Sequence, residues 1–313
     1  MFKYLSGVKP TGELHIGNYV SIIKPVIDKG IKDDTLFLIA DNHALAQQDK
    51  ITHTREIYNT LRTFGMDHII IQSQVPEIME LNWILSCFTA KGLLNRAHAY
   101  KSCVSTNIEN KEDADKGVFC GLYTYPILMT ADLAMFDTEY VFVGKDQNQH
   151  IEIAKEVIKK FNYINKTNLL NVPKQLEDQS PTVIGNDGRK MSKSYNNTLP
   201  LMCLEEELRK YVFKIKTNNK LDGESKEYNE TYLGTLFDVF FHDKQYMVNQ
   251  LHRMCDTGQS WKDIKEFVFD CINIHLKLNK CKYDVSIEQT DKVKEQIKQV
   301  KKKVKVLKKM IYN

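Results

Sequence analysis

The sequence lacks three features that would place it in a specialised class of protein. No run approaches the ~18 consecutive apolar residues of a membrane-spanning helix. No two of the seven cysteines form a C-x-x-C pair, so a zinc or iron–sulfur site is not indicated. No internal repeat or low-complexity linker interrupts the chain. With 313 residues, 42% hydrophobic and 27% charged, it has the composition of a globular protein with room for an α/β core and a second, smaller unit.

No signal peptide is expected from the first residues of the sequence. Residues 1–5 lead directly into the first predicted strand, which leaves no room for a signal peptide. The cysteines are scattered and odd in number, as is typical of reduced thiols. We therefore expect a cytoplasmic protein, or the mature form of an organelle protein, without a membrane partner.

The first half of the chain alternates short apolar runs with helical patterns. Strands are expected over residues 4–8, 35–40, 69–71 and 138–143, with helices between them over 51–64 and 77–88. This alternation predicts βαβ units and a mostly parallel sheet. Ligands of such α/β proteins bind at the carboxyl ends of the strands. The polar groups that follow three of these strands, near His15, residues 41–43 and residues 144–147, are thus expected to line one crevice.

The pattern changes after residue 194, where strand signals fade and helical segments continue to the end. We expect an α/β protein with a Rossmann-like parallel-sheet catalytic domain over residues 1–195 and an all-α domain over 196–313. Residues 291–313 hold nine lysines and two acidic residues, a net charge of +7, so the remaining residues sum to −3 of the total +4. Apolar residues at 293, 297, 300, 304, 307 and 311 form one stripe of a helix, with the lysines opposite. These lysines form either a solvated surface or a contact for RNA.

Two short segments carry the chemistry. Residues 10–18, Pro-Thr-Gly-Glu-Leu-His-Ile-Gly-Asn, form a Gly-containing turn between a strand and a helix, which directs backbone N–H groups at an anion. Residues 188–194, Gly-Arg-Lys-Met-Ser-Lys-Ser, place two lysines three positions apart after a strong turn signal. Lysine ammonium groups on a flexible loop suit the growing charge of a pyrophosphate leaving group.

In this order, the two segments resemble the HIGH and KMSKS elements of class I aminoacyl-tRNA synthetases. The resemblance implies adenylate formation from ATP, with Mg²⁺ carried on the ATP phosphates and no metal site of the protein itself. The implied catalytic residues are His15, Lys190, Lys193 and Lys9, the last standing where many relatives have Gln. The implied ATP-binding residues are Thr11, Gly17, Asn18, Gly144, Asp146, Gln147, Val183, Ile184, Lys190, Met191, Ser192, Lys193 and Ser194.

Residues 125–132, Tyr-Pro-Ile-Leu-Met-Thr-Ala-Asp, resemble the amino-acid pocket helix of the tyrosyl and tryptophanyl synthetases. Many tyrosyl enzymes have Gln at the position of Met129 and a hydroxyl-binding Tyr at that of Leu5. The two apolar residues leave a tyrosine hydroxyl unpaired and suit an indole, whose single N–H Asp132 would accept. Residues 144–150 and 41–44 match the G-x-D-Q-x-x-H and D-x-H-A elements of the tryptophanyl family. The implied tryptophan-binding residues are Leu5, Gly7, His43, Tyr125, Met129, Asp132, Val141, Val143 and Gln147.

The resemblance implies activation of L-tryptophan with ATP and its transfer to tRNA(Trp), by a homodimer whose interface lies around residues 80–130. Tyrosine–tRNA ligation is the nearest alternative. A synthetase-like RNA-binding paralogue is disfavoured by the intact KMSKS element, because a pure binder needs no pyrophosphate loop. A small nucleotidyltransferase is disfavoured by the helical, lysine-rich final third, because an enzyme of small substrates needs no such surface.

Overall fold

The computed structural model describes residues 1–46, 48–144, 147–176, 183–191, 195–228, 232–280 and 286–312. Its contacts divide the chain into two compact units. Unit 1 comprises Met1–Gly12, Val26–Asp178 and Val285–Asn313, and unit 2 comprises Glu13–Pro25 and Gln179–Asp284. The chain therefore enters unit 2 twice, and its last helix belongs to unit 1. None of the helices in the described ranges has the length and apolar character needed to cross a membrane.

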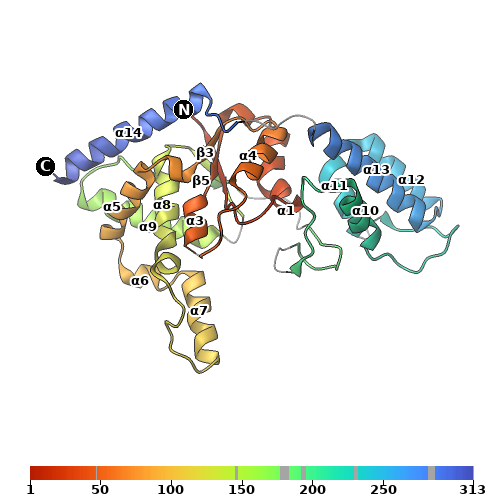
Figure 1. Cartoon of the computed structure of the whole chain (residues 1–313), viewed down its shortest axis with the longest axis horizontal. Helices are drawn as coiled ribbons and strands as arrows, with labels where there is room; N and C mark the ends of the chain where they lie inside the picture. Colours follow the sequence, from red (N-terminus) through yellow and green to blue (C-terminus); the bar gives the residue numbers. More distant parts are fainter. Residues whose placement is uncertain are drawn as a thin grey trace. The chain divides into compact units, whose positions relative to one another are not determined.

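Unit 1 is built on a five-stranded parallel sheet in the order β3-β2-β1-β4-β5 (Figure 1). The strands are β1 (Tyr4–Val8), β2 (Thr35–Ile39), β3 (Ile69–Ile71), β4 (Tyr140–Phe142) and β5 (Lys174–Leu176). All five residues of β2 are buried, as a strand covered on both faces requires. The parallel sheet is as predicted, although β4 is shorter than expected. β5 was not predicted, because its three residues, Lys-Gln-Leu, carry little strand signal.

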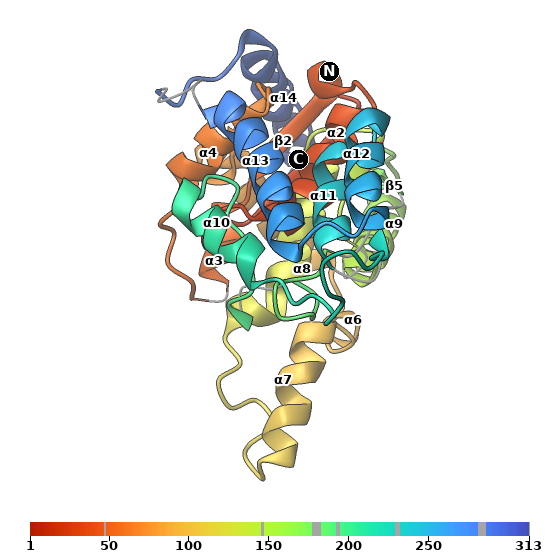
Figure 2. The same ribbon diagram turned by 90° about the vertical axis from the view of Figure 1, so that its right-hand side faces the viewer.

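Helices surround the sheet and form most of the core. Unit 1 contains α2 (Lys24–Asp28, which begins in unit 2), α3 (Asp41–Leu45), α4 (Thr54–Thr63), α5 (Glu77–Phe88), α6 (Lys91–Leu94), α7 (His98–Glu109), α8 (Cys120–Met135), α9 (Asn148–Ile164) and α14 (Asp291–Tyr312). One face of the sheet, including Leu5, Leu36 and Leu38, packs with apolar residues of α5, α8, α9 and α14. Figure 2 shows α7 and the loop after it extending away from these packed helices.

The longer elements of unit 2 in its described part are helices. It contains α1 (Ile16–Asn18), which continues through a π-helical turn over Tyr19–Ile23, and α10 (Glu205–Lys214), α11 (Tyr232–Phe241), α12 (Gln245–Asp256) and α13 (Trp261–Lys280). The ring of Tyr19 stacks on Phe240 of α11 with centroids 5.5 Å apart. This contact joins the early segment of the chain to the later helices within one core.

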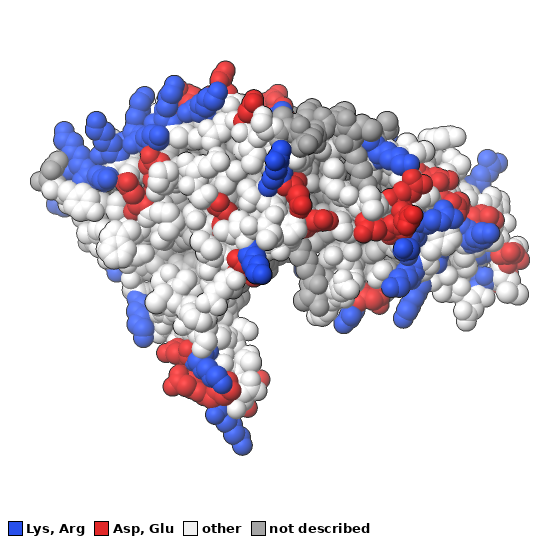
Figure 3. Space-filling view, viewed as in Figure 1, with Lys and Arg blue, Asp and Glu red and all other residues white. Residues whose placement is uncertain are grey.

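The terminal helix α14 follows the predicted stripe, with one difference. Val293, Val300, Val304 and Leu307 are buried, as the spacing predicts. Most of its lysines lie on the outer face, where Figure 3 shows a row of basic side chains along this helix. Lys303 is the exception at 7% exposed, so the expectation that all the lysines face outward is wrong for this residue.

Candidate active site

Asp132 lies at the centre of a buried polar cluster in unit 1. Its Oδ2 accepts a hydrogen bond from Nε2 of His43 at 2.8 Å, and its Oδ1 accepts one from Nε2 of Gln72 at 2.7 Å. Asp132 is 5% exposed, and Gln72 is fully buried. An ionised carboxylate offers about four acceptor positions, so Asp132 keeps the capacity for another donor.

Three elements bring this cluster together at the carboxyl edge of the sheet. His43 lies on α3 directly after β2, Gln72 directly follows β3, and Asp132 lies in the last turn of α8. Asp41 links the ends of β2 and β3, because its Oδ1 accepts the Ser73 backbone N–H at 2.9 Å. Sequence reasoning missed Gln72 and Ser73. Their signal was the polar character of the residues directly after a buried strand.

A second chain of hydrogen bonds connects Tyr125, His150 and Gln147. The Tyr125 hydroxyl lies 2.5 Å from His150 Nε2, and His150 Nδ1 lies 2.8 Å from Gln147 Oε1. Because the amide oxygen can only accept, Nδ1 carries the imidazole proton and Nε2 accepts from the tyrosine. The Tyr125 ring also meets His43 edge-on at a centroid distance of 6.4 Å. Tyr125, His43 and Asp132 therefore lie near one another in unit 1.

The predicted apolar residues of the amino-acid site lie on the central strands and on α8. Leu5 of β1 pairs in register with Val141 of β4, and both are buried. Met129 and Val143 are partly buried and pack against the same core. The remaining member, Gly7, pairs with Leu38 on β2.

Residues 15–18 of unit 2, His-Ile-Gly-Asn and called the HIGN segment below, are held together by hydrogen bonds around His15. The imidazole Nδ1 accepts the Gly17 backbone N–H at 3.0 Å, while Asn18 Oδ1 accepts the His15 backbone N–H at 3.1 Å. This reciprocal arrangement is a capping box. Since Nδ1 accepts, the neutral imidazole carries its proton on Nε2. A Cβ on Gly17 would lie 2.8 Å from His15 Cε1, so glycine is needed here for the histidine ring.

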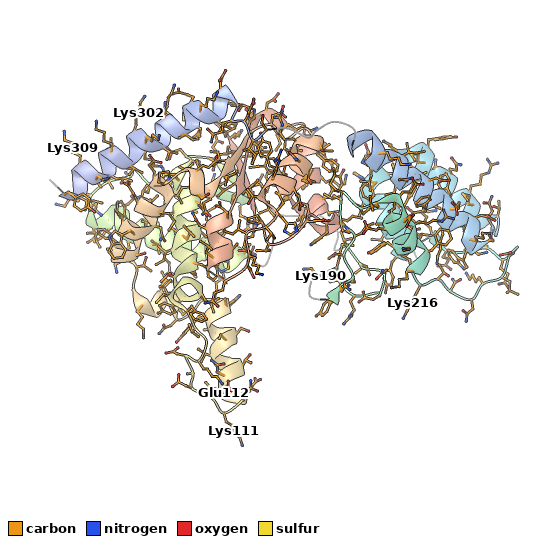
Figure 4. The ribbon with its side chains drawn as sticks, viewed as in Figure 1. Lys111, Glu112, Lys190, Lys216, Lys302 and Lys309 are labelled. Carbon is orange, nitrogen blue, oxygen red and sulfur yellow. The ribbon has the colours of Figure 1, made fainter. Side chains whose placement is uncertain are left out.

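Lys190 lies on a tight turn of the same unit (Figure 4). It forms an antiparallel bridge with Ile184, and the Met191 N–H donates to the Val183 carbonyl at 2.9 Å. Gly188 has a φ of +84°, a left-handed conformation that favours glycine.

The chain just beyond the KMSKS element pairs with the HIGN segment. The Ile16 N–H donates to the Leu199 carbonyl at 3.0 Å, and the Leu201 N–H donates to the Leu14 carbonyl at 2.8 Å. Unit 2 therefore ties the two predicted ATP elements together through the backbone.

Three other predicted site residues, Lys9, Thr11 and Gly144, lie just after strands of the sheet. Lys9 and Thr11 follow β1, and Gly144 follows β4 and accepts the Gln147 N–H through its carbonyl at 2.9 Å. Four predicted ATP-binding residues lie outside the described ranges, namely Asp146, Ser192, Lys193 and Ser194.

The fold and the site define a class of protein. Strand order 3-2-1-4-5 with polar residues at the carboxyl ends is the arrangement of a doubly wound nucleotide-binding protein. A family profile described as tRNA synthetases class I (W and Y) matches residues 1–290. The chain belongs to this family.

The similar proteins point to one branch of the family. The tryptophan–tRNA ligase of Neisseria meningitidis serogroup A is 38% identical over 305 residues, which cover 94% of this chain and 90% of the relative. The tryptophan–tRNA ligase of Xanthomonas campestris pv. campestris is 37% identical, over 93% of this chain and 70% of the relative.

Solved structures agree with this branch. The structure of tryptophanyl-tRNA synthetase from Campylobacter jejuni complexed with ADP and tryptophan has a TM-score of 0.81 at 30% identity and covers 99% of both chains. A tyrosyl-tRNA synthetase from Archaeoglobus fulgidus, at 16% identity and a TM-score of 0.63, shares the fold alone.

Proposed function

We propose that this protein is a tryptophan–tRNA ligase. It activates L-tryptophan with ATP to form tryptophanyl-AMP and pyrophosphate, and then transfers tryptophan to the 2′-hydroxyl of the terminal adenosine of tRNA(Trp) with release of AMP. The observation that carries the proposal is the buried cluster around Asp132, in a chain whose relatives named above are tryptophan–tRNA ligases over more than 90% of its length.

The amino-acid site distinguishes an indole from a phenol. The free acceptor capacity of Asp132 suits the indole N–H, while Leu5 and Met129 give the side chain an apolar slot without a partner for a hydroxyl. We assign Gln147 and Tyr125 to the polar end of the amino acid. Both are hydrogen-bonded to His150, which fixes their positions next to the site.

The ATP site uses donors and positive charge. His15 Nε2–H and Asn18 contact ATP, and Lys190 and Lys193 hold the pyrophosphate as it leaves. ATP enters as its Mg²⁺ complex, with the ion carried on the phosphates as part of the substrate. The tryptophan carboxylate attacks the α-phosphorus, and the bond to the β-phosphate oxygen breaks. Positioning and charge stabilisation account for the rate in such a transfer, because the protein supplies no covalent step.

The tRNA contacts the helical part of the chain and the outer face of α14. Lys301, Lys302, Lys305 and Lys309 are exposed and form no ion pair within the described residues. Lys302 and Lys309 point away from the helix in Figure 4. We call these four residues the lysine face. Unpaired positive charge of this density attracts a polyanion. The helices of residues 196–280 would bind the anticodon of the tRNA. The protein would act in the cytoplasm, where tRNA is charged.

The active form is proposed to be a homodimer. Met79, Trp83 and Cys87 lie four residues apart on α5 and are all exposed, Trp83 at 68%. Side chains at this spacing share one face of a helix. An exposed apolar face of this kind fits the expected interface around residues 80–130.

Pyrophosphate exchange with each of the twenty amino acids tests the proposal. Incorporation of labelled pyrophosphate into ATP should require tryptophan and proceed poorly with tyrosine. Exchange with another amino acid, or with none, would refute it.

A further inference from the structure

The carboxyl end of α8 is held by side chains from the last helix of the protein. The final carbonyl groups of any helix lack partners within that helix. Here Lys303 Nζ donates to the Ala134 carbonyl at 2.7 Å, and Gln296 Nε2 donates to the Phe136 carbonyl at 3.0 Å. Asp137, the next residue, has a φ of +53°, so α8 ends with a non-glycine residue in a left-handed conformation.

Gln296 and Lys303 of α14 form a buried contact with the end of α8. Gln296 and Lys303 are seven residues apart, which is two helical turns and hence one face of the helix. They are 3% and 7% exposed. Lys303 Nζ also donates to Asp137 Oδ1 at 2.5 Å, so the ammonium has a carboxylate partner. Burial lowers the pKa of Lys303, and the bond to Asp137 opposes this shift. A cation at a helix carboxyl end also complements the helix dipole.

This contact lies next to the amino-acid site. Asp132 is in the same last turn of α8, two residues before Ala134. Its two oxygens are held by His43 and Gln72 from other elements, so a small displacement of the turn would change both bonds. A last turn without partners for its carbonyl groups frays, and Asp132 would move with it.

We propose that Lys303, assisted by Gln296, is a positioning residue for tryptophan recognition. The two side chains hold the last turn of α8 and so hold Asp132, which makes α14 part of the amino-acid site as well as a basic surface. The inference rests on the proposed role of Asp132 in binding the amino acid.

The test compares Lys303→Met with Lys298→Met in pyrophosphate exchange. Lys298 lies on the same helix, is exposed and pairs with Glu295 of its own helix, so its replacement should leave exchange unchanged. Lys303→Met should raise KM for tryptophan by about tenfold or more, the effect of a lost charged hydrogen bond, with KM for ATP unchanged. Lys303→Arg should have a KM for tryptophan much closer to that of wild type, because the guanidinium can still donate to the Ala134 carbonyl.

Two further measurements keep the outcomes distinct. Gln296→Leu, which removes only the bond to Phe136, should raise KM for tryptophan by a smaller factor and serves if Lys303→Met fails to fold. Lowered thermal stability with an unchanged KM for tryptophan in both variants would overturn the inference. A wild-type enzyme that activates a different amino acid would refute the proposed function instead, and the KM for that amino acid would then test Lys303.

Discussion

The side-chain amide of Asn197 bridges the two ends of the KMSKS loop. Its Nδ2 donates to Asp187 Oδ1 at 2.8 Å and to the Lys190 carbonyl at 3.2 Å, and Asn197 is 2% exposed. The hydrogen bond from Asn197 lowers the pKa of Asp187 to about 2, and the hydrogen bond from the Arg189 backbone N–H is the second cause of this shift. The carboxylate is therefore ionised throughout the working pH range. Residues before and after the loop are thus connected by one buried side chain that also contacts the backbone of Lys190.

Asn197→Ala should slow adenylate formation. The substitution leaves Asp187 and the Lys190 carbonyl without this donor and loosens the base of the loop, so we expect about a tenfold lower kcat, the usual effect of one lost buried hydrogen bond. KM for tryptophan should not change. Pyrophosphate exchange measures both constants, with Asn196→Gly as the control, since Asn196 is exposed and has a φ of +50° that glycine tolerates. Equal kcat values for Asn197→Ala and wild type would contradict the prediction.

Lys193→Ala should reduce adenylate formation more severely. If Lys193 stabilises the departing pyrophosphate, its loss should lower kcat by on the order of 10²-fold or more. Tryptophan affinity should be nearly unchanged, because the lysine acts on charge that develops in the transition state. Single-turnover measurement of adenylate formation separates this step from product release. An exchange rate equal to that of wild type would remove Lys193 from the mechanism.

Amino-acid selection should depend on Asp132, Met129 and Leu5. Tyrosine in this pocket would bury an unpaired hydroxyl at a cost of about 1–3 kcal/mol, so wild type should prefer tryptophan by at least about fivefold. Asp132→Ala should narrow the preference for tryptophan over phenylalanine while ATP binding is retained. Met129→Gln combined with Leu5→Tyr should shift the pocket toward tyrosine with poor turnover, because neighbouring side chains are not repacked. Better activation of tyrosine than tryptophan by the unmodified protein would favour the tyrosyl alternative.

The lysine face should contribute salt-dependent affinity for tRNA. Replacing Lys301, Lys302 and Lys305 with Gln should weaken tRNA binding, and each lost phosphate contact should reduce the slope of log K against log salt by roughly one. Tryptophan activation should be retained, because these side chains lie on the outer face of α14. Filter binding over a range of salt concentrations provides the measurement. A slope identical to that of wild type would mean that the lysines only keep the surface solvated.

Thermal stability should fall in acid partly because of His68. Burial, assisted by the charge of Lys292, lowers the pKa of His68 in the folded protein. The unfolded chain therefore takes up this proton first, and folding loses stability as pH falls below about 6.5. His68→Gln, which can still bond to Thr290, should reduce the drop in Tm between about pH 7.5 and about pH 5.5. If Tm falls equally with pH in wild type and in His68→Gln, the acid sensitivity belongs to other groups.

Local pattern alone determined much of this protein. The bounds of β1, β3 and α5 and the stripe of α14 were predictable, because hydrophobic period and turn residues act over a few neighbouring positions. The HIGN and KMSKS elements were sufficient to predict the family and the reaction, and the family profile and the similar proteins confirm that prediction. The roles of the individual site residues and the division at residue 195 stay predictions.

Tertiary structure decided which side chains support the site. Gln72 meets Asp132 across 60 positions, and Lys303 meets Ala134 across 169. Lys301 and Lys303 flank the apolar stripe of α14 at similar angles, so no local pattern distinguishes the buried Lys303 from the exposed Lys301. Only the packing of α14 against α8 turns Lys303 inward. At Gly17, the structure adds a close approach that the sequence does not show, because a Cβ there would lie 2.8 Å from Cε1 of His15. Contacts between distant residues depend on how whole elements pack, and that information is spread over the entire chain.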